Sequence, residues 1–417
     1  MSRRPPTYRA TGRVRGPAFD LLSAGYPPPG FSFEHSGLGV AGGSDGGFPI
    51  AWDGDDLTRF AHEVQAQLAT IEVEGDAVPF ACGGLGYAPG IGRLTVATHA
   101  MQRTEAGRTR SIEVVRKGRT GSLATPKAMS PVSPLELHDP FSDLQVREVP
   151  TAAEYAKAVR TVTERIHAGE LRKVVLARTL EVDAGRDLDP RRLAKRLRSV
   201  DPDAYTFAVP TPDGVMVGAS PELLVSRRGL DVRSNPLAGS APRSGDPDED
   251  RGNAEALVAS AKDREEHAVV VEAVAESLLP FCEALEHDPE PVLLATANVW
   301  HLSTRFTGTL REPAPNALEL VAALHPTPAV CGTPREVAQA LIAELEPFDR
   351  GCYAGPVGWM DANGDGEWAI ALRCAELRGT RAILYAGAGI VADSVPDLEV
   401  DETERKFRAF LDSLRWG

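Results

Sequence analysis

EWAIALRCAEL at residues 367–377 and RAILYAGAGIV at residues 381–391 are apolar runs whose length is typical of buried β-strands. The chain around them has the periodicity of helices, at residues 334–346 and 401–415. The last third of the chain therefore alternates strands with helices. This alternation predicts a mixed α/β fold rather than a bundle or a β-sandwich.

The same alternation extends upstream from this stretch. Residues 151–169 begin with a Thr N-cap, carry Glu three residues later and close with Gly, which predicts a helix. We predict a strand at residues 171–182, a helix at 189–200, a hairpin around Pro212–Gly214 and one long helix from about Asp250 to Leu279.

The first third has a different pattern. From residue 31 to about residue 129, short apolar segments alternate with Gly, Asp and Pro turns, which predicts an antiparallel meander with one helix near residues 56–70. Residues 130–150 are rich in proline and indicate a linker. We divide the chain into a flexible, Arg- and Pro-rich tail at 1–30, a β-rich part at 31–145 and a mixed α/β region at 146–417.

Composition excludes several classes of function. The chain has 417 residues, a formal net charge of −14 and 42% hydrophobic residues, so it can bury a large core but is a poor candidate for nucleic acid. No apolar run is long enough to cross a membrane. The five cysteines are odd in number and none has C-x-x-C spacing, which argues against a disulfide framework and favours the cytoplasm. A monomer is the default expectation.

Two helical segments carry candidate metal-binding carboxylates. In residues 262–279, Glu266 aligns with apolar positions, whereas the other glutamates of this segment form a polar stripe. A carboxylate on an apolar face needs a partner, either a salt bridge at the core edge or a metal ion. Glu399, Glu402 and Lys406 share one helical face. They form either a surface ion-pair ladder or, with Glu266, an all-oxygen site that suits Mg²⁺.

Lysines are scarce, because only seven of the 45 basic residues are Lys. Lys173 heads a predicted strand, where an exposed edge charge is the ordinary interpretation, and Glu222 directly follows Pro221. The glycine-rich segment at residues 83–92 lacks the context of a nucleotide-binding loop. The one at residues 386–394 indicates a backbone that approaches something closely.

Taken together, these segments resemble the chorismate-utilising enzymes, a family that includes isochorismate and salicylate synthases and the large subunits of anthranilate and aminodeoxychorismate synthases. The resemblance is close over roughly residues 150–417 and loose before them. The motifs that carry it are KVVLAR (173–178), GASPELLVSR (218–227), NPLAGSAPR (235–243), KDREEH (262–267), VWHLST (299–304), LHPTPAVCGTP (324–334), ELEPFDRGCYAGPVGW (344–359), GEWAIALRCA (366–375), YAGAGIV (385–391) and DETERKF (401–407).

The resemblance implies a fold and a set of roles. The fold would be a large, mostly antiparallel, two-layered β-sheet flanked by helices, with residues 146–417 as the chorismate-binding catalytic region. Lys173 would be the general base that activates water, and Glu222 the general acid. The other positions that match family site residues are Glu266 and Glu402 as Mg²⁺ ligands, Glu399 as a carboxylate acting through water, and Gly239, Ser240, His301, Ala329, Tyr353, Arg373, Gly387, Gly389 and Lys406 around the substrate.

The reaction implied is the Mg²⁺-dependent isomerisation of chorismate to isochorismate, in which water attacks C2 while the C4 hydroxyl leaves. Isochorismate serves siderophore, menaquinone and salicylate-derived pathways alike. Two alternatives remain open, a salicylate synthase and a non-catalytic chorismate-binding subunit. Ala329 and Val330 resemble isochorismate-only relatives, whereas salicylate-forming relatives tend to carry Thr and Ala. The chain departs from many relatives in having Val400, where they have Trp.

Overall fold

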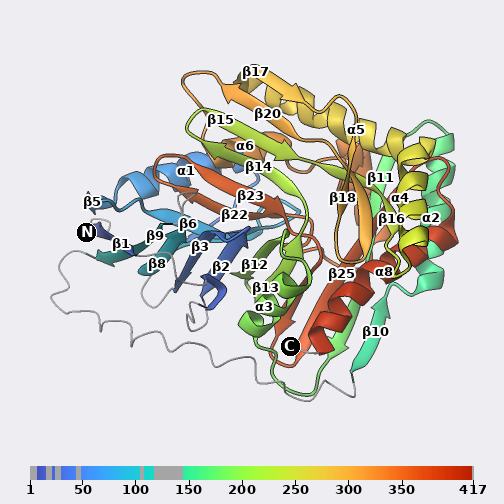
Figure 1. Ribbon diagram of the computed structural model, residues 1–417, viewed down its shortest axis with the longest axis horizontal. Coiled ribbons are helices and arrows are strands. Elements are labelled where there is room, and N and C mark those ends of the chain that lie inside the picture. The colour runs from blue at the N-terminus through green and yellow to red at the C-terminus, as the bar shows by residue number, and fades with distance from the viewer. Residues whose placement is uncertain are drawn as a thin grey trace.

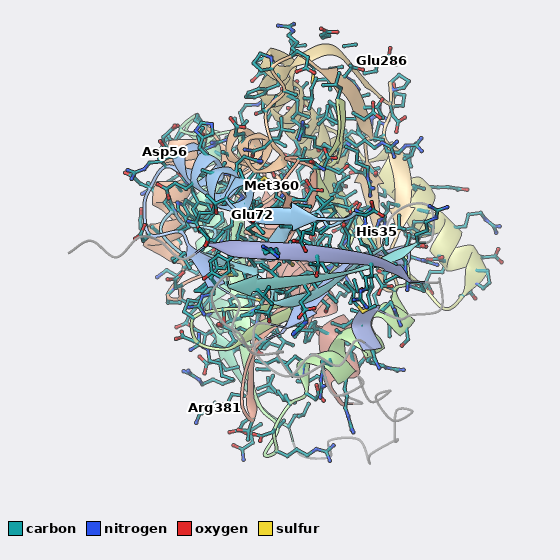
Figure 2. The ribbon with its side chains drawn as sticks, turned by 90° about the vertical axis from the view of Figure 1, so that its left-hand side faces the viewer. His35, Asp56, Glu72, Glu286, Met360 and Arg381 are labelled. Carbon is teal, nitrogen blue, oxygen red and sulfur yellow. The ribbon has the colours of Figure 1, made fainter. Side chains whose placement is uncertain are left out.

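The computed structural model describes residues 7–15, 21–23, 30–43, 48–103, 108–116 and 144–415. Figure 1 shows two large sheets with helices on their outer sides. In Figure 2, seen from the side, Glu286 and Arg381 lie at opposite ends of the molecule, and Glu72 lies between them.

The first sheet, which we call sheet A, has 13 strands. Its path is β10-β11-β25-β24-β13-β12-β2-β3-β8-β9-β1-β5, and β21 pairs with β11. All its pairs are antiparallel except β1 with β5. The strands are β1 (Tyr8–Arg15), β2 (Phe31–His35), β3 (Leu38–Gly43), β5 (Glu72–Glu74), β8 (His99–Arg103), β9 (Thr109–Arg116), β10 (Gln145–Val149), β11 (Lys173–Asp183), β12 (Tyr205–Pro210), β13 (Val215–Ser220), β21 (Gly332–Thr333), β24 (Cys374–Arg378) and β25 (Arg381–Ile390).

Sheet B has nine strands in the order β17-β20-β15-β14-β23-β22-β6-β7-β4, and the small sheet C has the order β16-β19-β18. The strands of sheet B are β4 (Phe48–Ala51), β6 (Phe80–Leu85), β7 (Gly92–Val96), β14 (Leu223–Arg228), β15 (Asp231–Asn235), β17 (Cys282–His287), β20 (Phe306–Leu310), β22 (Pro356–Asp361) and β23 (Gly366–Ile370). Those of sheet C are β16 (Leu237–Pro242), β18 (Val292–Ala295) and β19 (Val299–Ser303).

Helices cover the outer faces of the sheets. Their bounds are α1 (Leu57–Ala69), α2 (Ala152–His167), α3 (Pro190–Val200), α4 (Pro247–Ala259), α5 (Ala261–Leu278), α6 (Ala317–Leu324), α7 (Arg335–Leu345) and α8 (Pro396–Arg415). The helices α3 and α8 pack on sheet A, while α6 packs on sheet B and contacts α1 and α5 (Figure 1).

Two clusters of buried side chains hold these layers together. The larger lies between the sheets and contains Phe207 of sheet A and Trp368 of sheet B. The smaller lies between sheet A and the helices α3 and α8, where Leu197 and Phe410 contribute apolar side chains. Burial of apolar surface on both faces of sheet A is the main stabilising contribution to this arrangement. The predicted fold, two mostly antiparallel layers flanked by helices, is confirmed.

The local predictions for the helix starts are also confirmed. Asp56 caps α1 by accepting a hydrogen bond from the backbone N–H of Arg59. Thr151 and Glu154 form a reciprocal capping box at the start of α2. The hairpin around Pro212–Gly214 joins β12 to β13, as predicted.

Three predictions about the elements were wrong. The long helix at about 250–279 is two helices, because the Ser260 side chain accepts a hydrogen bond from Asp263 N–H and starts α5 anew. Part of the predicted flexible tail forms β1, which is held by β9 and β5. The predicted linker at 130–150 contains β10; its residues 130–143 lie outside the described residues.

The five cysteines are all buried and free. Within the described ranges, no helix is both long and apolar enough to cross a membrane.

Candidate active site

A cavity opens between sheet A, sheet C and α8, with about 750 Å³ of empty space including its mouth. All nine predicted substrate-binding residues line it, together with Glu222, Glu266 and Glu402. Lys173 and Glu399 are not among its lining residues. Val330, which the sequence pointed to together with Ala329, also lines the cavity. The lining residues that sequence reasoning did not assign are Val175, Pro221, Leu237, Ala238, Arg350, Ala354, Leu372, Tyr385 and Ala386.

Glu222 lies between β13 and β14 and lines the cavity. The residue is only 2% exposed. Burial raises the pKa of its carboxyl to about 8, against a smaller lowering by the Leu237 N–H, which donates to Oε1 over 3.5 Å, and by Lys173 and Lys406. Glu222 therefore keeps its proton at neutral pH and is equipped to act as an acid.

Lys173 begins β11 and is 1% exposed. Its Nζ lies 3.0 Å from Oε1 of Glu266 on α5. Gly389 of β25 covers this pair, because a Cβ built there would lie 2.1 Å from Glu266 Oε1 and 3.0 Å from Lys173 Cε. The glycine-rich segment at residues 386–394 was predicted to approach something closely, and Gly389 leaves the space that the buried Lys173–Glu266 pair occupies.

Lys406 and Glu402 face each other one turn apart on α8. The Lys406 Nζ donates to Glu402 Oε1 over 2.6 Å and to the Gly387 carbonyl over 2.7 Å. Burial would raise the pKa of Glu402, but Lys406, a hydrogen bond with Ser240 and the charge of Lys262 outweigh burial and lower the pKa to about 2. Glu402 is therefore a permanent carboxylate in the cavity wall.

The third predicted metal-site residue, Glu399, lies behind this wall and is 2% exposed. The Nζ of Lys262 on α5 donates to Glu399 Oε1 over 2.8 Å. Burial and the neighbouring Glu402 raise the pKa of Glu399, while Lys262 lowers it less. Each of the three predicted metal-site carboxylates thus faces its own lysine.

The donor chemistry of these carboxylates suits magnesium, although the described residues contain no group of three or more His, Cys, Asp and Glu that could hold a metal ion. Mg²⁺ commonly uses one or two protein carboxylates and completes its octahedron with water and substrate oxygens. Glu266 and Glu402 provide two carboxylates in the wall of one cavity. They fit the ion by donor type and placement, and the lysines now hold the oxygens that it would use.

His301 of β19 and Arg373 form a fixed polar pair in the cavity. Arg373 Nη2 donates to His301 Nε2 over 3.0 Å, so the ring proton must be on Nδ1, which donates to the Gly239 carbonyl over 3.1 Å. Burial, Arg373 and Lys406 lower the pKa of His301 to about 3, which keeps the ring neutral. Arg373 has φ +48°, a conformation that a non-glycine residue adopts at a cost and that is frequent at functional sites.

Aromatic residues form another part of the wall. Tyr353 stacks on Tyr385 of β25 with 5.0 Å between ring centroids. Arg350 lies beside them, pairs with Glu346 at 2.6 Å and donates to the Val330 carbonyl over 2.7 Å. Arg350 therefore fixes the backbone of the segment that brings Ala329 and Val330 to the cavity.

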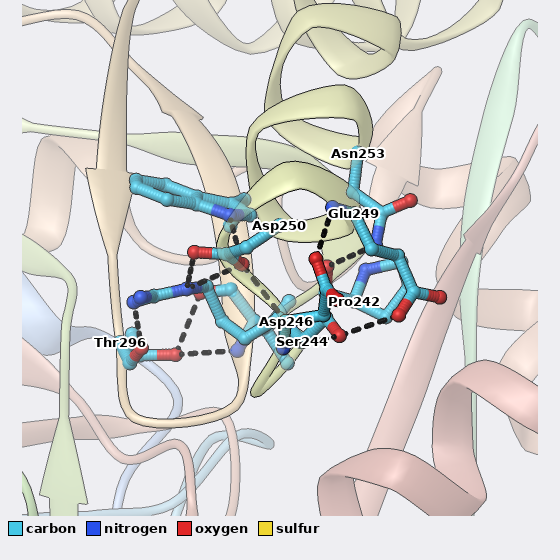
Figure 3. A network of polar contacts seen from close by, with 10 residues as sticks. Pro242, Ser244, Asp246, Glu249, Asp250, Asn253 and Thr296 are labelled. Carbon is cyan, nitrogen blue, oxygen red and sulfur yellow. Dashed lines mark hydrogen bonds and ion pairs between the residues drawn. The ribbon is translucent and has the colours of Figure 1, made fainter.

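A polar network anchors sheet C, which supplies Gly239, Ser240 and His301 (Figure 3). Asp250 of α4 accepts hydrogen bonds from Arg243 Nε at 2.9 Å and from Trp300 Nε1 at 3.0 Å. The Arg243 guanidinium lies 4.4 Å from the Trp300 ring centroid. Since Arg243 follows β16 directly and Trp300 precedes His301, the network fixes both strands outside the cavity.

Two of the residues that sequence reasoning did not assign, Lys262 and Tyr385, differ in how visible they were in the sequence. Lys262 heads the KDREEH motif and is one of only seven lysines, so its rarity was an available signal. Tyr385 precedes the glycine-rich part of β25 and, apart from that position, carries no local signal, because its role depends on stacking with Tyr353 across the fold.

Comparison with known proteins supplies the family. The model of the family described as "Chorismate binding enzyme" matches residues 107–415. The chain belongs to the chorismate-binding enzyme family. The matched residues include every predicted site residue, so in this chorismate-binding enzyme the cavity lies wholly within the region that defines the family.

Individual relatives agree with this assignment. The isochorismate synthase DhbC of Bacillus subtilis is 48% identical over 276 residues, which cover 64% of this chain and 69% of DhbC. The salicylate biosynthesis isochorismate synthase of Pseudomonas aeruginosa is 42% identical over 261 residues, covering 63% of this chain and 54% of that protein. The structure of MenF, the menaquinone-specific isochorismate synthase of Escherichia coli, superposes with a TM-score of 0.79 and 26% sequence identity, covering 99% of this chain and 96% of MenF.

Proposed function

We propose that this chorismate-binding enzyme is a magnesium-dependent isochorismate synthase, which converts chorismate to isochorismate. The observation that carries the proposal is the buried Glu222, whose raised pKa keeps a proton available in a cavity with cationic groups on its wall. The names of DhbC and MenF, both isochorismate synthases, support the same reaction.

Glu222 would donate its proton to the C4 oxygen, because hydroxide is a poor leaving group and water is a good one. The new bond joins a water oxygen to C2, the two ring double bonds shift, and the C4–O bond breaks. The attacking water must lose a proton, and we assign Lys173 to accept it, which requires its amine to be neutral and released from the ion pair with Glu266. One proton enters from Glu222 and one leaves to Lys173, so the substrate and product have the same composition.

Cationic and polar groups would hold the carboxylates of chorismate. Arg373 is oriented by His301, and Lys406 is oriented by the Gly387 carbonyl. The neutral His301 leaves the guanidinium of Arg373 as the charged group on that side of the cavity. Tyr353 offers a hydroxyl at the same wall.

Magnesium bound by Glu266 and Glu402 would neutralise the ring carboxylate and draw electron density from the conjugated system. Glu399 would act on it through water. Turnover of the purified protein with chorismate tests the assignment: we expect isochorismate in the presence of Mg²⁺, loss of turnover with excess EDTA, and recovery on adding Mg²⁺ back. Full turnover in excess chelator would refute the metal, and absence of turnover with Mg²⁺ would refute the reaction.

We expect isochorismate without stoichiometric pyruvate. Elimination of pyruvate needs the side chain of the substrate to fold over the ring, and the branched Val330 lines the cavity with only 2% exposure. Chromatography of the mixture with a lactate dehydrogenase couple distinguishes the products. One pyruvate per chorismate consumed would favour a salicylate synthase instead.

A further inference from the structure

The three lysines that face the predicted metal-site carboxylates differ in their surroundings. The Lys173 and Lys406 side chains are 1% and 16% exposed, whereas the Lys262 side chain is 30% exposed. Lys406 is also tied to the Gly387 carbonyl, and Lys173 is enclosed beneath Gly389. Lys262 is therefore the lysine of the three with the most freedom to leave its carboxylate.

The charge of Lys262 interacts with the whole acidic group. Burial lowers the pKa of Lys262, but Glu399, Glu266 and Glu402 together raise it above its ordinary value. A positive charge at this position is thus stabilised by the same three carboxylates that would bind a divalent cation. Two cations beside one set of carboxylates repel each other, so the ammonium and a metal ion oppose each other electrostatically.

Lys262 has open space beside it into which its side chain could turn. Lys262 also lines a second, open hollow, together with Arg172, Glu265 and Asp393. Glu265 lies in this hollow and is well exposed. The Lys262 side chain can turn from Glu399 into this hollow and keep its charge in water, which is the inexpensive environment for an ammonium group.

We propose that Lys262 is an internal competitor of the metal ion, and that it sets the affinity of the acidic group for Mg²⁺. The ammonium neutralises Glu399 and yields the carboxylate when the cation binds to the group. The inference rests on the magnesium part of the proposed function and adds a residue that does not itself ligate the ion. As a consequence, the protein without substrate should bind Mg²⁺ more weakly than the carboxylates alone would allow.

Calorimetric titration of Mg²⁺ into the protein without chorismate, at pH 8, tests the proposal. Lys262→Met should bind Mg²⁺ about tenfold more tightly than the wild type, which corresponds to about 1.4 kcal/mol. Lys262→Arg keeps the positive charge, so its affinity for Mg²⁺ should stay within about twofold of the wild-type affinity. Lys157→Met removes an exposed lysine of α2 and controls for the change in net charge.

Thermal unfolding supplies a second reading. Without metal, Lys262→Met should unfold at a lower temperature than the wild type, because buried Glu399 loses its partner. Saturating Mg²⁺ should raise its unfolding temperature more than that of the wild type. If Lys262→Met does not fold, Lys262→Gln keeps a hydrogen-bond donor for Glu399 and serves in both measurements.

Equal or weaker Mg²⁺ binding by the methionine or glutamine variant would overturn the proposal. An equal increase in the Lys157→Met control would overturn it as well, since it would show a general effect of net charge. These outcomes differ from failure of the proposed function, because a wild-type protein that binds no Mg²⁺ would refute the metal itself before any variant is compared.

Discussion

Replacing Glu222 with glutamine should reduce activity and raise stability at the same time. Glutamine has nearly the same shape as a protonated glutamic acid but carries no proton that it can release. As the proposed general acid, Glu222 should contribute on the order of 10²–10⁴ to the rate, so kcat of Glu222→Gln should fall by that factor. Chorismate should still bind, because the cationic groups that hold it are unchanged.

The stability effect follows from the pKa. Burial raises the pKa of folded Glu222 to about 8, whereas its ordinary value is 4.5. Between these pH values the folded protein holds a proton that the unfolded chain has lost, so the free energy of unfolding falls as the pH rises. The two pKa values lie about 3.5 apart, and each pH unit corresponds to about 1.36 kcal/mol. Raising the pH from 4.5 to 8 should therefore lower the free energy of unfolding by up to about 5 kcal/mol through this group. Glu222→Gln escapes this loss.

Denaturant unfolding at pH 5 and pH 9 measures the difference. We compare the free energy of unfolding of Glu222→Gln with that of the wild type at each pH. The advantage of the variant should be several kcal/mol larger at pH 9 than at pH 5. Wild-type kcat should fall as the pH rises through about 8, because Glu222 loses its proton. Glu276→Gln, which alters an exposed carboxylate on α5, should change neither profile.

Near-normal kcat in Glu222→Gln would refute the assignment of Glu222 as the acid, since the acid would then be another group. Parallel stability profiles of the variant and the wild type from pH 5 to pH 9 would refute the raised pKa of Glu222. That result would mean that Glu222 is ionised in the folded protein despite its burial.

Three further substitutions test the rest of the site. Lys173→Ala should lower kcat by on the order of 10²–10⁴ while chorismate still binds; near-normal turnover would place the base elsewhere. Gly389→Ala puts a Cβ 2.1 Å from Glu266 Oε1, so the affinity for Mg²⁺ should fall and activity should fall by roughly 10²-fold. Gly252→Ala in α4 has free space around the new Cβ and should change neither the affinity nor the activity. Asp250→Asn should raise KM for chorismate about tenfold with a smaller change in kcat, because it loosens sheet C; unchanged steady-state constants would show that the network does not position the site.

Features encoded in neighbouring residues could be predicted from the sequence. The caps at Asp56 and Thr151 act on backbone groups within three residues, so the starts of α1 and α2 are visible in the sequence. The break at Ser260 was missed although Asp263 follows it at capping distance. Residues that favour helix lie on both sides, and a serine within such a run can either continue the helix or begin a new one.

Features that depend on distant partners could not be predicted in this way. Tyr8–Arg15 is rich in arginine and becomes a strand because β9, about one hundred residues away, pairs with it. The site residues were found as motif positions, but their pairing with lysines depends on how α5, α8 and β11 meet. Neither the burial of Glu222 nor the ion pair of Lys262 with Glu399 follows from the residues beside them.

Within the described residues, two strand pairings link the β-rich first part to the catalytic region, and they limit how the protein can be shortened. β2 pairs with β12, where Phe33 faces Phe207, and β6 pairs with β22, where Cys82 faces Trp359. A fragment beginning near residue 146 would keep the cavity residues but leave β12 and β22 as open edges with no covering strand. Such edges readily recruit strands from other molecules, so that fragment should precipitate or form irregular oligomers. A soluble and assayable form of this enzyme therefore has to retain the strands β2 and β6, remote as they are from the chemistry.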